Sequence, residues 1–142
     1  MLLVALSSDK RMERKWHTVL TTAMSGVFLL LAQVSGESAI MVTLLLLTFS
    51  FACFFGRFGP FWALPSDVLP APVAGVGIAV INGIGNLGGF AGPFAFGAIR
   101  TATGSFALAL ALAGLVLIAS AVVLLFLRMP ARQPIVVARP AA

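Results

Sequence analysis

Charged residues are scarce in this sequence, and their scarcity excludes most classes of protein. Only 9% of the 142 residues are charged, nine of them basic and four acidic. Soluble domains carry roughly 25% charged residues, so these side chains cannot cover a globular surface. Disorder is excluded for the opposite reason, because 61% of the residues are hydrophobic and the mean hydropathy is +1.11. A membrane protein is the class that remains.

Residues that carry chemistry are equally few. The one cysteine, Cys53, lies in an apolar run and the one histidine, His17, stands alone, which excludes a disulfide framework and a Cys/His zinc site. The sequence has no paired carboxylates and no nucleophile placed in a pattern with the histidine. We therefore expect no enzyme activity, no cofactor and no metal.

The excess of basic residues, with a pI near 11.3, does not indicate nucleic-acid binding. Four basic residues lie between Lys10 and Lys15 and three lie beyond Leu127, rather than along one face of an element. Basic residues grouped in this way are typical of loops between membrane spans.

Four segments are long enough to cross a bilayer, which takes about 20 mainly apolar residues. They cover residues 16–34, 38–64, 73–99 and 105–127. They lack the alternation of barrel strands, and a backbone in hydrocarbon must satisfy its own hydrogen bonds, so we predict helices. The connections are short and contain turn residues (Ser35-Gly36-Glu37, Pro65 to Pro72 and Thr103-Gly104), so neighbouring helices must be antiparallel. The sequence therefore predicts an all-α polytopic membrane protein.

The flanking segments set the orientation. Residues 1–15 are expected to contain the stump of a preceding helix, Met1–Leu6, and a basic loop, and residues 128–142 a disordered tail. Placing Asp9–Lys15 in the cytoplasm puts eight of the nine basic residues there and leaves only Arg100 outside. We expect a multi-pass protein in the lipid bilayer of the cell inner membrane, with the basic loop, the tail and both termini in the cytoplasm.

The third span carries two amides on a helix rich in small residues. At 3.6 residues per turn, Asn82 and Asn86 share a sector of about 80° with small residues, while Leu87 lies on the opposite side. The two amides either form hydrogen bonds with another helix or face a hydrated cavity and bind a solute. The sequence leaves both alternatives open.

Small residues on the same helix predict close packing. Gly85, Gly88, Gly89 and Gly92 have small-xxx-small spacings, which let another helix backbone approach closely in lipid. Pro93 removes one helical hydrogen bond and is expected to kink the helix. A hinge during transport is the second interpretation of these residues.

Arg57 lies inside the second span, where a cation costs several kcal/mol unless it is solvated or paired. It either reaches the cytoplasmic headgroups or faces a cavity, where its planar fork would suit a carboxylate. Phe61 and Trp62 belong either to an interfacial aromatic belt or to a binding surface in the same cavity.

Two strings, in this order, resemble the major facilitator superfamily: Phe61-Trp-Ala-Leu-Pro65, and Asn82-Gly-Ile-Gly-Asn86-Leu-Gly-Gly-Phe90. More narrowly, they resemble its anion:cation symporter branch, whose members carry organic acids such as tartrate, phthalate or hexarates with protons. The segment Ser8–His17 is similar to the branch's cytoplasmic loop between the eighth and ninth helices, a relative of the Asp-Arg-x-Gly-Arg-Arg signature. The glycine of that signature is absent here and the spacing is stretched.

The resemblance covers nearly the whole chain but implies only the last four of the family's twelve helices, which form two halves around the substrate site. It implies that Asn82 and Asn86 lie on the eleventh helix and face the central cavity. It also implies that Asp9, Arg11 and Arg14 lie in the loop whose ion pairs help to hold the outward-facing state. The implied partners are a small organic anion and a proton, once the missing helices complete the transporter.

Two other functions stay open. A non-transporting membrane remnant or assembly partner would keep the packing surface and lack the pathway. A small dimeric four-helix transporter of cationic drugs would need a carboxylate in the membrane, and the four predicted spans contain none.

Overall fold

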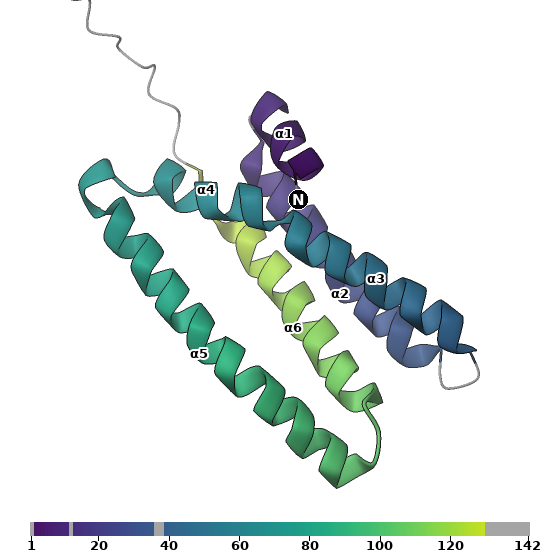
Figure 1. Cartoon of the computed structure of the whole chain (residues 1–142). Helices are drawn as coiled ribbons and strands as arrows, with labels where there is room; N and C mark the ends of the chain where they lie inside the picture. Colours follow the sequence, from purple (N-terminus) through teal and green to yellow (C-terminus); the bar gives the residue numbers. More distant parts are fainter. Residues whose placement is uncertain (1, 12, 36–38, 130–142) are drawn as a thin grey trace, which may run out of the picture.

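The computed structural model describes residues 2–11, 13–35 and 39–129, and the elements within them are α-helices. In chain order they are α1 Leu2–Arg11, α2 Arg14–Val34, α3 Ile40–Gly56, α4 Phe58–Val68, α5 Ala71–Thr103 and α6 Ala107–Phe126 (Figure 1). Four stretches of these residues are long and apolar enough to cross a membrane: Arg14–Val34, Ile40–Val68, Ala71–Thr103 and Ala107–Phe126. The predicted all-α architecture with four spans is confirmed.

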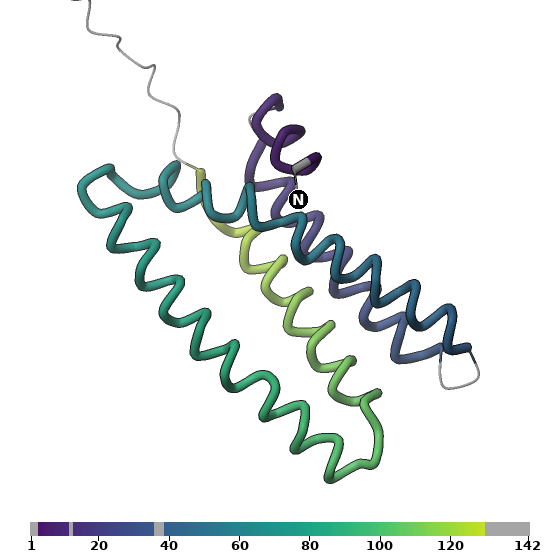
Figure 2. Tube along the Cα trace, viewed as in Figure 1, coloured from purple at the N-terminus to yellow at the C-terminus, as the bar shows by residue number. Residues whose placement is uncertain are grey.

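Helix α2 forms the centre of the packed part of the molecule, with extensive contacts to α3 and to α6. Helix α5 differs, because among the described elements it contacts only α4 and α6. Figure 2 shows it standing away from both α6 and α3 along most of its length. None of its residues is buried within the described part of the chain. The helix with the two amides is therefore the most open element of the fold.

Two glycines let the backbones of α2 and α6 approach closely. A Cβ placed on Gly26 would lie 2.8 Å from the carbonyl oxygen of Gly114 and 2.8 Å from Cγ1 of Ile118. A Cβ placed on Gly114 would lie 2.9 Å from the carbonyl oxygen of Gly26. Real Cβ atoms do not approach other atoms this closely, so only glycine fits at either position. Such small-residue contacts hold helices together where lipid gives no hydrophobic drive.

A pair of buried serines joins α2 to α3. The hydroxyl of Ser25 donates to the carbonyl oxygen of Ser50 at 3.0 Å, and the acceptor of the Ser50 hydroxyl is the carbonyl oxygen of Ser25, at 2.9 Å. The two residues are 1% and 3% exposed. Because hydrocarbon offers no water, each hydroxyl needs such a partner, and the pair fixes the register of α3 on α2.

The second predicted span is two helices rather than one. Helix α3 ends at Gly56, α4 begins at Phe58, and Arg57 between them has φ −67° and ψ −23°. Pro60 explains the break, because it has no N–H to donate to the carbonyl of Gly56 and its ring crowds that carbonyl. The predicted end at Leu64 is also corrected, since α4 continues beyond it to Val68. Figure 1 shows α4 turning from the direction of α3 to cross towards the start of α5.

Other boundaries also differ from the predicted ones. Asp9 and Arg11 lie on α1, because the first segment is helical as far as Arg11 rather than a stump followed by a loop. Helix α5 runs through Pro93 and ends at Thr103, followed by the capping residue Gly104, whose φ of 72° suits glycine. Residues 36–37 of the first predicted turn and residues 130–142 of the predicted tail lie outside the described residues.

Candidate functional site

The α1 end of the molecule, where α1 and α4 meet the start of α2, contains an ion-pair cluster around Arg14. Its Nη1 donates to Oδ1 of Asp67 at 2.9 Å, and its Nη2 lies 3.7 Å from Oδ1 of Asp9. The side chains of Arg14 and Asp67 are 24% and 29% exposed, whereas that of Asp9 is 64% exposed. Arg14 therefore ties α2 firmly to α4, and only weakly to α1, because the exposed pair is longer and better solvated.

The sequence points to part of this cluster. It groups Asp9 and Arg14, which the structure brings together, with Arg11, which makes no ion pair within the described residues. It does not point to Asp67. The predicted topology could have pointed to Asp67, because four antiparallel spans place residues 65–72 at the same end of the molecule as Asp9–Lys15.

Lys15 connects this end to α6. Its Nζ donates to the carbonyl oxygens of Leu125 and Leu127, both at 2.8 Å. These oxygens belong to the end of α6, where carbonyl groups lack helical partners and the helix dipole is negative. The lysine thus caps α6 and holds the start of α2 beside it.

His17 holds α1 against α2. Its Nδ1 lies 2.8 Å from the carbonyl oxygen of Glu13 and its Nε2 lies 3.1 Å from the hydroxyl of Ser7. A carbonyl oxygen can only accept, so this contact places a proton on Nδ1, while the hydroxyl of Ser7 can donate to Nε2 or accept from it. The position of α1 is therefore fixed by a specific contact.

Arg57, at the junction of α3 and α4, is surrounded by phenylalanine rings. Its guanidinium carbon lies 4.3 Å from the ring centroid of Phe54 and 5.8 Å from those of Phe58 and Phe61. These ring faces stabilise the cation. Its Nε is buried without a hydrogen bond, and no carboxylate in the described part of the chain pairs with it. Trp62 packs edge-on against Phe61 at 5.3 Å, so three predicted site residues form one cluster.

Asn82 and Asn86 are exposed, and neither side chain has a hydrogen-bond partner among the described residues. Their neighbours on the same face are open too, since a Cβ on Gly75 or Gly89 would meet no atom within 4 Å. Packing against another described helix of this chain is therefore excluded for both amides. Packing on a further helix and binding of a solute both stay predictions.

A groove of about 800 Å³ separates α5 from α3. Its lining is apolar or small apart from one arginine, and consists of Phe51, Phe54, Gly88, Gly89, Gly92, Pro93, Phe96, Gly97, Arg100 and Phe106. Of the predicted packing or hinge residues, only Gly85 is not part of this lining. No Cβ added at any of these glycines of α5 would meet an atom within 4 Å, so no described element packs closely against them.

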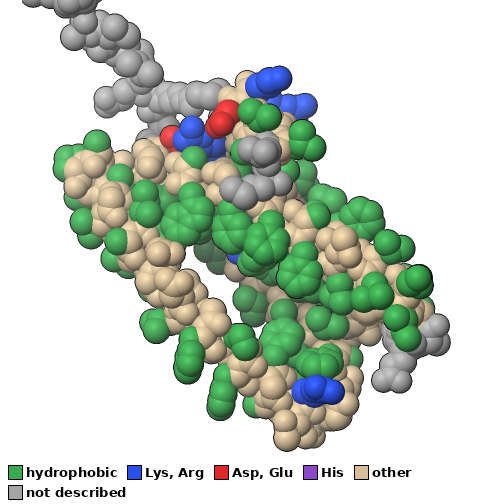
Figure 3. Space-filling model, viewed as in Figure 1, with side chains coloured by type: hydrophobic (Ala, Val, Ile, Leu, Met, Phe, Trp, Pro, Cys, Tyr) green, Lys and Arg blue, Asp and Glu red, His purple; other side chains and the backbone are tan. Residues whose placement is uncertain are grey.

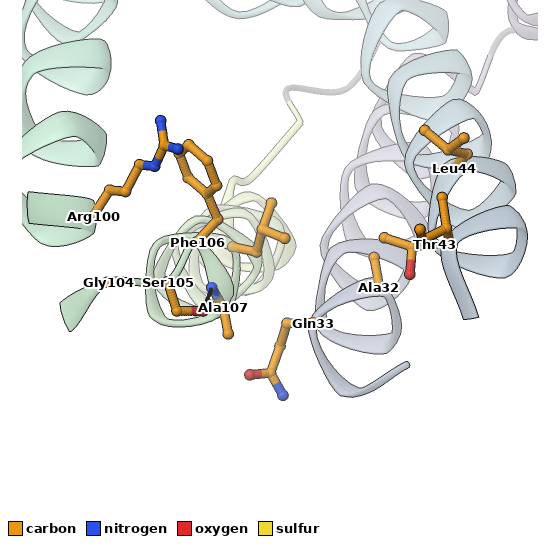
Figure 4. A pocket seen from close by; sticks show the side chains of 11 residues that line it. Ala32, Gln33, Thr43, Leu44, Arg100, Gly104, Ser105, Phe106 and Ala107 are labelled. Atoms are coloured by element: carbon orange, nitrogen blue, oxygen red, sulfur yellow. Dashed lines mark hydrogen bonds between the residues drawn. The ribbon is translucent and has the colours of Figure 1, made fainter. Parts of the chain in front are cut away.

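A second hollow, of about 370 Å³, lies at the end of the molecule opposite to α1, among α2, α3 and the connection from α5 to α6. Figure 4 shows the guanidinium of Arg100 over the ring of Phe106, 4.5 Å from its centroid, while the amide of Gln33 lies across the pocket and points away. The cation and the amide do not converge on one point. This pocket therefore lacks the converging polar groups of a ligand site.

The space-filling view summarises the charge distribution on one face. Figure 3 shows basic and acidic side chains close together at the α1 end, a basic group at the opposite end and hydrophobic side chains between them. This arrangement defines a class of protein. It is a helical membrane protein with span-length helices, ion pairs at one end and one open helix that carries two amides.

Bacterial transporters are similar to this chain. A tartrate transporter by name, from Agrobacterium vitis, is 41% identical over 127 residues, which cover 89% of this chain and 29% of that protein. A second protein of that name from the same bacterium is 39% identical over 129 residues, covering 90% and 28%. A quinolone resistance transporter of Acinetobacter baumannii is 35% identical over 109 residues, covering 75% and 24%.

These relatives confirm the resemblance to transporters of the major facilitator type that the sequence motifs predict. The chain spans less than a third of the length of each of them. No family model and no solved structure matches the chain.

Proposed function

We propose that this chain is part of a major-facilitator-type transporter that moves a small organic anion with a proton across the inner membrane by alternating access. The observation that carries the proposal is the open face of α5, where Asn82 and Asn86 share one side of a span-length helix and have no described partner. Amide donors and acceptors can replace water around a carboxylate or hydroxyl. The names of the two relatives from A. vitis support an organic acid as the substrate class.

Arg57 is the proposed counter-ion of the substrate carboxylate. The three phenylalanine rings offset part of the free energy needed to place a cation in a span, but they cannot replace hydrogen-bond acceptors. A carboxylate would provide two acceptors for the planar guanidinium fork. Phe61 and Trp62 would then form a wall of the same site. In the alternative arrangement, the guanidinium reaches lipid headgroups.

The ion pairs at the α1 end are the proposed lock of the outward-facing state. Arg14 bridges α2 and α4 through Asp67, and Asp9 and Arg11 lie on the adjoining helix. Opening this end to admit or release solute on the cytoplasmic side would separate these elements. The coupling carboxylate for the proton would come from another part of the transporter, since Asp67, the one carboxylate within the described spans, is paired with Arg14 near the end of α4.

Both termini are proposed to lie in the cytoplasm, because the α1 end carries Lys10, Arg11, Arg14 and Lys15 while Arg100 lies near the other end of α5. A reporter enzyme that is active only in the periplasm, fused after Ala142, is expected to give no activity, and a cytoplasmic reporter at the same place is expected to be active. The opposite pair of results would reverse the proposed topology.

Substrate binding by the α5 amides is tested in a complete transporter, made by joining the chain to the remaining part of the A. vitis tartrate transporter. Asn82→Ala is expected to leave the amount of protein in the membrane unchanged and to weaken the apparent affinity for the organic acid about tenfold, the effect of losing roughly 1.4 kcal/mol. Radiolabelled uptake into proteoliposomes measures that affinity.

Leu87→Ala, on the opposite side of α5, is the matched control and is expected to change neither quantity. If Asn82→Ala removes the protein from the membrane, or leaves uptake unchanged, the amide is a packing group. A complete transporter with normal membrane levels but no uptake of organic acids would favour a non-transporting remnant or assembly partner.

A further inference from the structure

The surroundings of Arg57 are aromatic on several sides. Its guanidinium carbon lies 4.3 Å from the ring centroid of Phe54, and 5.8 Å from those of Phe58 and Phe61. The rings of Phe54 and Phe58 meet edge to face, with their centroids 5.6 Å apart and an interplanar angle of 82°. In such a pair one ring directs its edge at the other, so its own face stays open to a third planar group.

The segment around Arg57 offers few other hydrogen-bonding side chains. From Phe51 to Pro65 the remaining side chains are apolar, apart from the thiol of Cys53 and the indole N–H of Trp62. A hydroxyl group buried in such surroundings without a partner is destabilising, whereas an aromatic ring is not. The cluster therefore favours an acid with an aromatic carbon body over an acid that carries hydroxyl groups.

The guanidinium of Arg57 has an open hydrogen-bonding edge. Its Nε is buried and has no hydrogen-bond partner in the described part of the chain. A planar carboxylate can accept two parallel bonds from a guanidinium, one of them from this nitrogen. Phe58 and Phe61 are further from the guanidinium carbon than Phe54, so they can flank the group that the carboxylate carries.

We propose that the acid bound by Arg57 is an aromatic carboxylate of the benzoate type. Its carboxylate accepts from Nε and one Nη of Arg57, and its ring packs against those of Phe58 and Phe61. Phe54 is a positioning residue, whose ring supports the guanidinium. The inference rests on the proposed function, because it names the substrate class of the same site. It adds that aromatic acids bind there in preference to hydroxylated ones such as tartrate.

Quenching of Trp62 fluorescence measures binding to this cluster in the full chain. The ring of Trp62 lies 5.3 Å from that of Phe61, and Trp16→Phe removes the other tryptophan. The purified chain in detergent is titrated with 4-nitrobenzoate, an aromatic acid that quenches indole emission, and the quencher is then displaced by competing acids. Benzoate is expected to displace it at an about tenfold lower concentration than the non-planar cyclohexanecarboxylate, and tartrate is expected not to displace it.

Three variants separate the contributions of the ring and the cation. Phe58→Leu removes a ring but keeps an apolar side chain, and is expected to weaken benzoate binding about fivefold while leaving cyclohexanecarboxylate unchanged. Arg57→Gln is expected to abolish saturable quenching, and it removes a cation from a span, so membrane insertion is not impaired. Phe126→Leu on α6, where the residue is 80% exposed, is the control and is expected to change neither affinity.

Equal quenching in Arg57→Gln would overturn the proposal, because the nitrobenzoate would then only partition into the detergent. Displacement by tartrate or cyclohexanecarboxylate at the same concentration as by benzoate would also overturn it. So would a lack of saturable quenching both in the chain and in the complete transporter with its other tryptophans replaced by phenylalanine.

The fluorescence readout does not depend on uptake, so the two proposals can fail separately. Selective binding of benzoate, without uptake of any organic acid by the complete transporter, would contradict the proposed function and leave the aromatic site standing. Uptake of tartrate that depends on Asn82, without binding of benzoate, would contradict the aromatic site and leave the proposed function standing.

Discussion

Gly26→Leu and Gly114→Leu are each expected to prevent the chain from accumulating in the membrane as a folded protein. Each new Cβ would lie less than 3.0 Å from the backbone carbonyl oxygen of the other helix. A backbone carbonyl cannot rotate out of the way as a flexible side chain can. Overpacking of a tight site costs about 1–3 kcal/mol, and an obstructing backbone puts these variants at the upper end of that range or above it. Because α2 is the centre of the packed part, separating it from α6 removes the main contact of the fold.

Quantitative immunoblotting of membranes and thermal unfolding in detergent measure this effect. Gly83→Leu on α5 is the control, since a Cβ at that position meets no atom within 4 Å. It introduces the same side chain into a span, so it matches the change in hydrophobicity. Normal accumulation and an unchanged unfolding midpoint of both Gly26→Leu and Gly114→Leu would contradict the close approach of α2 and α6.

The four spans could be predicted because charged and turn-forming residues together mark their ends. Hydrocarbon disfavours ionised side chains, so long apolar stretches between these residues give the number and approximate length of the spans. The break at Arg57 was also within reach of the sequence, because Pro60 removes a hydrogen bond inside the second span. The predicted connection to the third span begins at Pro65, but this residue lies within α4, since the effect of a proline on a helix depends on whether neighbouring groups can satisfy the freed carbonyl.

The sequence does not reveal which residues meet across helices. Gly26 and Gly114 are separated by most of the chain. Gly26 follows Thr18 and Thr22 at four-residue intervals, but Gly114 has no such pattern, and the glycines of α5 have the pattern but no described partner. Ser25 and Ser50 resemble any other serines in a span until α2 and α3 are packed. Periodicity gives the face of a helix. The element that covers that face is determined by tertiary packing, which the periodicity does not reveal.

The face with Asn82 and Asn86 follows from helical periodicity, but its openness does not. An amide that binds a solute and an amide that bonds to another helix have the same sequence pattern. The contact of Arg57 with Phe54 is within reach of the sequence, because residues three apart lie side by side on a helix.

Asp67→Arg is expected to destabilise the α1 end of the molecule, and the exchange Arg14→Asp with Asp67→Arg is expected to recover part of the loss. The single variant places two guanidinium groups where a 2.9 Å ion pair joins α2 to α4. Removing one partner of a fully buried pair costs about 3–5 kcal/mol. With side chains 24% and 29% exposed, solvent screening lowers the expected loss to about 1–3 kcal/mol.

Recovery in the exchanged pair is expected to be incomplete for two reasons. An aspartate at position 14 would no longer attract Asp9, and it could not donate to the carbonyl oxygen of Ala63, which lies 3.5 Å from Nη1 of Arg14. Thermal unfolding in detergent compares the four proteins of this double-mutant cycle, and Asp9→Asn, which alters only the long, exposed contact, is expected to change the midpoint little. If the exchanged pair is no more stable than the less stable single variant, the two residues do not interact directly, and the bridge between α2 and α4 must depend on the apolar contacts of these helices.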